Sequence, residues 1–441
     1  MNIIWSCAIT TFLCCWSALI VNLPNPESTR WSTFGRKLLL LGLCAVAPEA
    51  IFQVALGQWL SANDSKKLFH ESGYSDWTLR HSFFVDMGGL HLRCPDHSSF
   101  PINSRQLHYL ITRGYATYPS IKENQIRDRN KVDGTLRLIT LIQTLFFMTS
   151  LLLRAVQKLA ITALELSTAA FVVLSILTTA FWFRKPADVE HCEFIEANAS
   201  VATIRGNENW PVDAAYTYTP LDFIGREEWS WSILWMHGLN CLRRLHLAGQ
   251  PQQLPVQRFQ NTVVPVIRGW FLALFAGSSL TYLGIFVAGW NYSFPTSIEQ
   301  ILWRSASLTA LVTAIAVFLT QRIFFQWCPS LCRITNRLRF SPETGEGLAA
   351  MQNKCPQKVF GRVDPLKRKI DHLFASLRNN SVSKDPALDA PVMAVMMTWF
   401  FGFFYVSARA YLIVADLVEL RSLPMSAYET LNWSSLSPFI P

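Results

Sequence analysis

Seven long apolar stretches constrain this chain more than any other feature of its sequence. A bilayer core of about 30 Å needs roughly 20 apolar residues in an α-helix. Only 16% of the 441 residues are charged, against about 25% in soluble proteins. The predicted spans are Ile3–Val21, Leu38–Leu60, Leu136–Leu153, Ala163–Phe183, Gly269–Trp290, Leu302–Phe325 and Val392–Leu420. We therefore expect an all-α, polytopic transmembrane helical bundle of about seven spans.

The basic residues predict which side each connector occupies. Counting those at span edges, 31 of the 39 Lys and Arg residues belong to three long connectors, 61–135, 184–268 and 326–391. Positive charge favours the cytosolic side of a membrane. We expect these connectors in the cytosol, the N-terminus on the same side, and the C-terminus on the opposite side. The membrane itself is either the endoplasmic reticulum or the plasma membrane.

The spans and connectors also define the expected organisation. It runs as 1–60 (helices one and two), 61–135 (connector), 136–183 (helices three and four), 184–268 (Trp-rich connector), 269–325 (helices five and six), 326–391 (basic connector) and 392–441 (helix seven and tail). Amphipathic helices lying in the membrane interface are expected within the connectors. The candidates are Tyr74–Leu92, with Trp77, Phe83 and Phe84 at the headgroups, residues 221–247, and Leu366–Leu377.

The first stretch resembles a signal peptide only in its hydrophobicity. It lacks a basic leading segment, and residues 21–24 make a poor cleavage site because small residues are missing. We expect this stretch to remain as a helix of the mature protein.

Motif searches exclude several classes of chemistry. The sequence has no Walker loop, dinucleotide-binding glycine motif, nucleophile elbow or paired zinc histidines. His91, Cys94 and His97 supply three ligands at short spacing, but a structural zinc site needs four. We expect no metal and no cofactor. The net charge is +9. The basic residues flank the apolar blocks, which favours anionic lipid over nucleic acid as the partner.

Glu49 is the strongest candidate for a functional residue. An ionisable side chain within a membrane is costly and therefore informative. Glu49 lies in the middle of the second stretch, directly after Pro48, and proline removes a backbone N–H and kinks a helix. A kink beside a carboxyl group could bind a cation, relay a proton or act as an acid. The alternative is a protonated Glu49 bonded to a neighbouring helix or paired with a base.

Arg409 is the second candidate, because the seventeen residues Val392–Ala408 that precede it in the last stretch are mostly apolar. It shares a helix face with Asp416, seven residues on, and could meet Glu49 across helices. The alternative is an arginine that snorkels from the end of a shorter span.

Glu165 is the third candidate for a catalytic carboxyl group. Thr162 and Glu165 match a capping box at the start of the fourth stretch, which would give Glu165 a structural role instead.

Blocks spread along most of the chain resemble a largely uncharacterised family of polytopic membrane proteins of filamentous fungi. The matching blocks are Ala47–Glu49, Trp77–His81, Phe83–Phe84, Met87–Gly89, Ile126–Asp133, Leu164–Leu166, Trp182–Val189, Arg409–Val414 and Leu420–Pro424. The middle connector, 191–268, resembles the family least. Some relatives occur in specialised-metabolite pathways. The resemblance therefore implies a fungal source and, as partners, an apolar small molecule and other pathway enzymes.

Three functions remain open at this point. The first is a membrane enzyme or accessory factor that cyclises or isomerises an apolar polyketide or terpenoid intermediate, with Glu49 as general acid. The second is a proton-coupled transporter or exporter that uses Glu49 and Arg409. The third is a seven-helix receptor or scaffold.

Overall fold

The computed structural model describes residues 2–25, 28, 30–129, 134–211, 214, 216–225, 229–246, 249, 253–261, 263–292, 294–327, 375–381 and 388–429. The chain forms two compact units. The first unit comprises residues 1–229, 251–312 and 404–441, and the second comprises 230–250 and 313–403. Most of the predicted Leu366–Leu377 helix lies outside the described residues.

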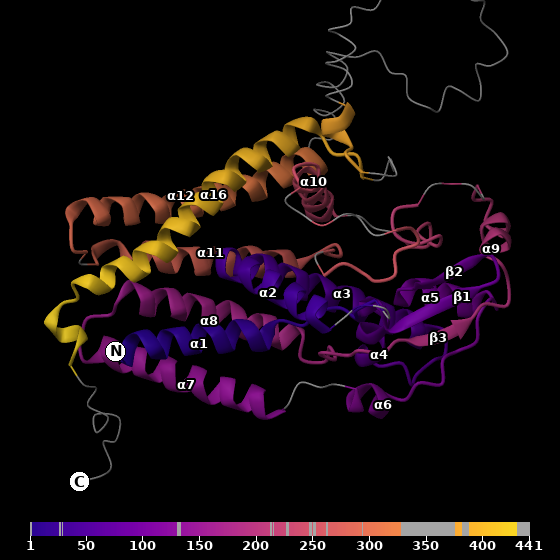
Figure 1. The fold of residues 1–441 in the computed structure, drawn as a ribbon, viewed down its shortest axis with the longest axis horizontal. Coiled ribbons are helices and arrows are strands. Elements are labelled where there is room, and N and C mark those ends of the chain that lie inside the picture. Colours follow the sequence, from indigo (N-terminus) through magenta and orange to yellow (C-terminus); the bar gives the residue numbers. More distant parts are fainter. Residues whose placement is uncertain are drawn as a thin grey trace, which may run out of the picture. The chain divides into compact units, whose positions relative to one another are not determined.

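Long apolar helices make up one part of the first unit (Figure 1). They are α1 (Asn2–Ala18), α2 (Arg30–Val46), α3 (Pro48–Glu71), α7 (Gly134–Val156), α8 (Ala163–Phe181) and α11 (Trp270–Ala288), with the start of α12 (Ser297–Arg322) and the end of α16 (Val392–Val418). Helix α1 packs against both α7 and α8, where Cys7, Cys14, Phe147 and Val172 form a buried cluster. The apolar stretches of the sequence are thus helical, as expected.

Five segments of the described chain are long and apolar enough to cross a membrane, and a bent pair of helices brings the number to six. The five are Leu138–Val156, Ala163–Phe181, Trp270–Asn291, Ser297–Phe325 and Val392–Arg421. Helix α1 is apolar but shorter, with Ile3–Ala18 as its apolar part. The structure therefore supports a multi-pass helical membrane protein, with seven spans remaining a prediction.

The second predicted span, Leu38–Leu60, is not one helix. It divides at Ala47 into α2 and α3, whose axes turn by 115°. Ala47 has φ −140° and ψ 72°, and Pro48 is the first residue of α3, a position where its missing N–H is harmless. The kink expected at Pro48 is confirmed, but it is a full break. We call these two helices the α2–α3 hairpin.

A small mixed α/β region, which the sequence did not predict, completes the first unit (Figure 1). Its elements are α4 (Leu79–Phe84), η1 (Val85–Gly89), β1 (Leu90–Cys94), β2 (His97–Pro101), α5 (Ser104–Thr112), α6 (Glu123–Asp128), β3 (Glu193–Glu196) and α9 (Val201–Asn207). The sheet has the order β2-β1-β3. Strand β1 pairs antiparallel with β2, His91 opposite Pro101, and parallel with β3, Leu90 opposite Glu193.

The expected placement of Trp77, Phe83 and Phe84 among lipid headgroups is wrong. All three are at most 1% exposed, and Trp77 stacks on Phe69 with ring centroids 4.0 Å apart. Trp77 and Phe84 belong to the core of the α/β region with strand residues such as Leu90 and Leu92. Burial of their apolar surface against protein, rather than lipid, fixes this segment.

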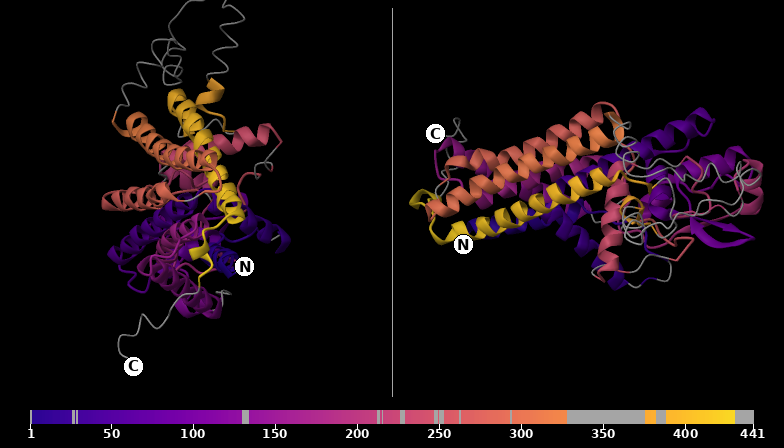
Figure 2. Two further views of the ribbon diagram at one scale, coloured as in Figure 1. Left: turned by 90° about the vertical axis from the view of Figure 1, so that its left-hand side faces the viewer. Right: turned by 90° about the horizontal axis from the view of Figure 1, so that it is seen from above.

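The second unit contains α10 (Ser230–Arg244) with parts of α12 and α16. Ile233 and Leu234 of α10 pack with Leu388, Ala390 and Val395. The helix expected within 221–247 therefore forms, and its position at a membrane surface stays a prediction. Short helical turns occur at η2 (Gly289–Asn291), η3 (Ile323–Trp327), η5 (Glu419–Arg421) and η6 (Met425–Ala427); two further views of the helices are given in Figure 2.

Candidate functional site in the apolar helices

The break between α2 and α3 places two helix ends inside the apolar helices. The last carbonyls of α2 carry partial negative charge, and the first N–H groups of α3 carry partial positive charge. Glu49 is the second residue of α3 and the acidic residue of its first turn. A carboxyl group at a helix N-terminus is electrostatically favoured. The dipeptide Pro48-Glu49 thus starts α3 and places a carboxyl group in its first turn.

Arg409 of α16 occupies the other side of the break. Its Nε donates to the carbonyl of Val46 at 3.1 Å, and Nη2 donates to the hydroxyl of Tyr282. The guanidinium carbon lies 4.5 Å from the ring centroid of Phe286 and 5.9 Å from that of Phe171. A cation bonded to the end of a helix and facing aromatic rings is stabilised by both contacts.

The guanidinium of Arg409 does not snorkel to a surface. Arg409 is only 1% exposed, and Phe171, which it contacts, lies near the middle of α8. The alternative of an arginine at the end of a shorter span is therefore wrong. At the break, the carbonyl of Val46 accepts the hydrogen bond from Arg409.

Glu49 and Arg409 belong to one cluster without a direct ion pair among the described residues. The hydroxyl of Tyr405, one turn before Arg409, donates to Glu49 Oε1. Three buried atoms of the neighbourhood have no hydrogen-bond partner, namely Glu49 Oε2, Arg409 Nη1 and Asp416 Oδ1. Unsatisfied buried polar atoms usually cost about 1–3 kcal/mol each, which makes this cluster the candidate site.

One face of α16 continues this polar cluster along the helix. Tyr405, Arg409, Asp416 and Glu419 follow at intervals of four, seven and three residues, which places them on a single face. Asp416 is 6% exposed and Glu419 is 2% exposed. Glu419 Oε2 accepts a hydrogen bond from the backbone N–H of Ala163, the first residue of α8, at 2.7 Å.

Lys185 marks the opposite end of α8. Its Nζ donates to Gln58 Oε1 at 2.8 Å and to Asn22 Oδ1 at 3.1 Å, and the residue is 2% exposed. Burial lowers the pKa of Lys185 to about 7, while the nearby Asp86 acts to raise it. Burial likewise raises the pKa of Asp86. We call Lys185, Glu49, Arg409, Asp416 and Glu419 the polar column.

Both arms of the α2–α3 hairpin return to this same end of α8. Lys37 of α2 lies 3.5 Å from the Asp188 carboxylate, and Gln58 of α3 accepts hydrogen bonds from Trp182 and Lys185. Each contact lies nine or ten residues from the break, which is about 15 Å of helix. The break therefore lies at roughly half the length of α8, and neither arm continues to its other end.

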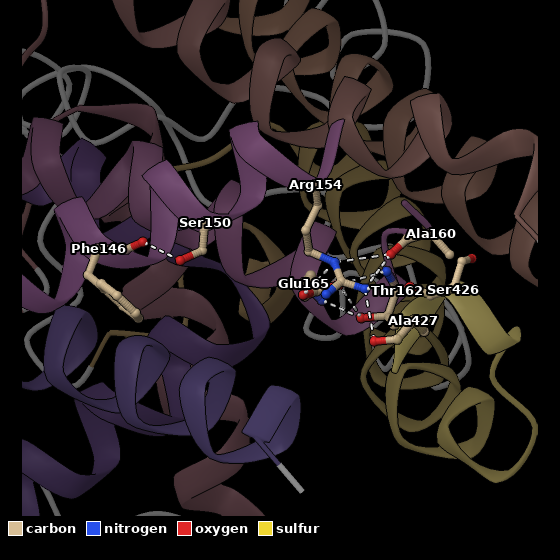
Figure 3. A network of polar contacts seen from close by, with 8 residues as sticks. All are labelled: Phe146, Ser150, Arg154, Ala160, Thr162, Glu165, Ser426 and Ala427. Atoms are coloured by element: carbon tan, nitrogen blue, oxygen red, sulfur yellow. Dashed lines mark hydrogen bonds and ion pairs between the residues drawn. The ribbon is translucent and has the colours of Figure 1, made fainter. Parts of the chain in front are cut away.

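Glu165 occupies a different and more complete network, drawn in Figure 3. The capping box is confirmed: Thr162 Oγ1 accepts from the N–H of Glu165 at 3.2 Å, and Glu165 Oε2 accepts from the N–H of Thr162 at 2.9 Å. Arg154 lies 3.6 Å from Glu165 and donates to the carbonyls of Ala160 and Ala427. These contacts give Glu165 a structural role, and its catalytic role stays a prediction.

Sequence reasoning missed Tyr282, Tyr405 and Asp86. Tyrosines are common at membrane depth, and nothing in the sequence distinguishes Tyr282 and Tyr405 from the other tyrosines among the 11 in the chain. Asp86 stood in a segment interpreted as an interfacial helix, where a carboxylate would be solvated. Lys185 directly follows a span, which is typical of a flanking charge; only the fold shows that it turns inward.

Comparison with known proteins adds one relationship. Residues 1–204 match a family of unknown function (DUF8562). That region contains the α2–α3 hairpin, Asp86, Glu165 and Lys185, whereas Tyr282, Arg409 and Asp416 lie beyond it. Searches of the curated proteins and of the solved structures found no significant match.

Proposed function

We propose that the protein transfers protons through its membrane-embedded helices and couples this transfer to the movement of an apolar small molecule. One observation carries the proposal: the polar column holds ionisable groups from one end of α8 to the other. Lys185 lies at one end, Glu49 and Arg409 near the middle, and Glu419 at the other end. Ionisable groups at successive depths in a membrane are typical of proton relays.

The α2–α3 hairpin supports the same function. Broken helices whose ends meet inside a bilayer form the ion and substrate sites of many secondary transporters. Here the end of α2 faces a cation, Arg409, and the start of α3 holds an acid, Glu49. We propose that Glu49 accepts and releases the proton, and that Arg409 stabilises its charged form.

In the proposed topology the hairpin is re-entrant and α1 crosses the membrane. The cytosolic side then gains Arg30, Arg36 and Lys37 besides the three basic connectors, and keeps the α/β region. Four Lys or Arg residues remain on the opposite side, Arg154, Lys158, Arg304 and Arg421. This charge bias is stronger than that of seven straight spans, and it puts both chain ends on the side away from the cytosol.

Proteoliposomes provide the test of proton transfer. The purified full chain is reconstituted with a pH-sensitive dye inside, and a potassium gradient with valinomycin sets the membrane potential. We expect the wild type to change the internal pH faster than protein-free vesicles do, and Glu49→Gln to match the protein-free rate. Asp76→Asn, on an exposed residue, serves as the matched control. Equal rates for the wild type and empty vesicles would refute the proposal.

A membrane enzyme or accessory factor of fungal specialised metabolism is the second candidate. Glu49 and Tyr405 are only half-buried, so in a bilayer lipid would border the acid. An apolar polyketide or terpenoid could reach Glu49 from the lipid and be protonated there, for cyclisation or isomerisation. The fungal resemblance of the sequence supports this setting, in the endoplasmic reticulum or the plasma membrane.

Metabolite profiling of a deletion strain separates the two candidates. Transport predicts that a finished product is made but accumulates on one side of the membrane. An enzyme predicts a missing product and an accumulating precursor, and the same pattern when Glu49→Gln replaces the wild type at equal protein level.

A further inference from the structure

A cavity of about 220 Å³ lies within the first unit, away from Glu49. It is bordered by the second half of α3, by the start of α5 and by residues 259–268, which precede α11. The apolar part of its wall comes from Leu60, Phe259, Val263 and Val264. The cavity is large enough for a small organic molecule.

Two close contacts build this wall. At Gly57 an added Cβ would stand 2.8 Å from the carbonyl oxygen of Pro265, so only glycine lets residues 264–265 pass so near α3. Asn22 joins three segments, since its backbone N–H donates to Asn261 Oδ1 at 2.7 Å, its Nδ2 donates to the carbonyl of Gln260, and its Oδ1 accepts from Lys185. The cavity is therefore held in shape by tertiary contacts from several elements.

Two residues in the polar part of the wall carry a buried acceptor oxygen without a hydrogen-bond donor. Asp86 Oδ1 accepts from the N–H of Ser104, the first residue of α5, at 2.8 Å. Its other oxygen, Oδ2, is buried and has no partner, and the same holds for Gln260 Oε1. Both residues border the cavity. A ligand that satisfies them must bring hydrogen-bond donors.

Charge decides between a neutral donor and a cationic one. Asp64, Asp86 and Asp222 line the cavity, together with Arg105 and Arg268. Asp222 is committed to a local turn, where it accepts from the N–H groups of residues 217, 218 and 219. Arg105 Nη1 donates to the carbonyl of Gly225. Asp64 and Asp86 are the other carboxyl groups of the wall, and Arg105 and Lys185 near Asp86 favour its charged form against the effect of burial.

We propose that this cavity binds a small molecule in which a protonated amine is attached to an apolar body. The ammonium group would bond Asp86 Oδ2 and Gln260 Oε1, and the apolar body would lie on Phe259 and Val264. A charge-assisted bond of this kind favours the amine over a neutral alcohol of equal size. Binding here does not require proton transfer through the polar column.

The test uses three probes of equal shape, phenethylamine, 2-phenylethanol and phenylacetate, titrated calorimetrically into the full chain in detergent at pH 7. We expect saturable binding of the amine, roughly tenfold or more weaker binding of the alcohol, and no binding of the acid. Asp86→Asn should weaken amine binding by a similar factor, and Asp76→Asn should leave it unchanged.

Because Asp86 also bonds α5, a second variant, Val263→Phe, fills the cavity from its apolar side. It should abolish amine binding while the melting temperature stays near that of the wild type. No amine binding to the wild type, equal binding of amine and acid, or amine binding unchanged in both variants would overturn the proposal. The proton-flux assay above is unaffected by any of these outcomes.

Discussion

Two buried clusters in the apolar helices contain the same kinds of side chain and differ in how completely they are bonded. Arg154 and Glu165 are 6% and 7% exposed, and together they bond the Thr162 N–H and the carbonyls of Ala160 and Ala427. In the cluster of Glu49 and Arg409, three buried atoms have no partner. The charged groups of the first cluster bond backbone groups at helix ends, whereas the second cluster keeps three polar atoms without a hydrogen-bond partner.

We expect this difference to distinguish structural from functional charges better than burial does. A fully bonded buried ion pair contributes to a unique fold, and losing one member leaves an uncompensated charge. A partly bonded cluster lowers stability and persists where function needs it. Four sets of variants test this difference, and we expect their effects on stability to decrease from Arg154 to Glu49.

Arg154→Ala should have the largest effect. The substitution leaves Glu165 without its cation and two buried carbonyls without a donor, which typically costs about 3–5 kcal/mol. We expect a large fall in the melting temperature of the purified chain, measured in detergent by intrinsic fluorescence. Arg184→Ala, on an exposed arginine, should leave it nearly unchanged, and an equal shift in both variants would contradict the structural role of Arg154.

His91 of β1 extends the comparison to the α/β region. It is 2% exposed, its Nδ1 has no partner, and burial lowers its pKa to about 4. The unfolded histidine binds its proton near pH 6.5, so protonation favours unfolding. Stability is fully present above pH 6.5 and is lost as the pH falls towards 4, by about 3 kcal/mol at this residue.

Melting temperatures between pH 7 and 4.5 test this expectation. His91→Leu should flatten part of the acid slope, whereas His97→Gln, on an exposed histidine, should not. Identical slopes for the wild type and His91→Leu would show that His91 is already protonated in the folded chain.

Thr162→Ala should have a moderate effect. Removing a side chain that caps a helix costs about 1 kcal/mol, and here it also takes a donor from Glu165, since Thr162 Oγ1 donates to Glu165 Oε2 at 3.1 Å. Thr162→Ser retains the hydroxyl group and should restore most of the loss. Equal melting temperatures for Thr162→Ala and the wild type would exclude the capping role.

Glu49→Gln should have the smallest effect on stability, under about 1 kcal/mol. The amide oxygen of glutamine can still accept from Tyr405, and the partly bonded cluster has little stability to lose. The same variant should remove the proton flux proposed above. A melting temperature lowered as far as that of Arg154→Ala would place Glu49 with the structural charges.

The long helices were predictable because apolar length alone requires them. The start of α8 at Ala163 and a kink at Pro48 also follow from local signals, a capping box and a missing N–H, but the division of the predicted span into two helices does not. Strand pairing did not, because β1 and β3 are about 100 residues apart and each has at most five residues. The surroundings of Trp77 and Phe84 were predicted wrongly because aromatic residues suit a lipid interface and a protein core equally well.

The candidate site was predictable in its charges and not in its partners. Glu49 and Arg409 stood out because ionisable residues are rare in apolar stretches. Tyr405, which bonds Glu49, and Tyr282, which bonds Arg409, are each separated from Glu49 by more than 200 residues, and no local pattern links them. The arrangement of helices, which brings three distant segments together, supplies what the sequence lacks.

The α2–α3 hairpin has a mechanical consequence. Both of its arms bond the residues that follow α8, Lys37 to Asp188 and Gln58 to Trp182, and both run on past these contacts, since α2 starts at Arg30 and α3 ends at Glu71. A crossing helix is anchored by polar chain at two membrane surfaces, and sliding it would drag that chain into lipid. In the proposed re-entrant topology the hairpin is anchored at one surface only, so moving its tip would draw no polar chain through the membrane and would require breaking the bonds of Val46 to Arg409 and of Glu49 to Tyr405.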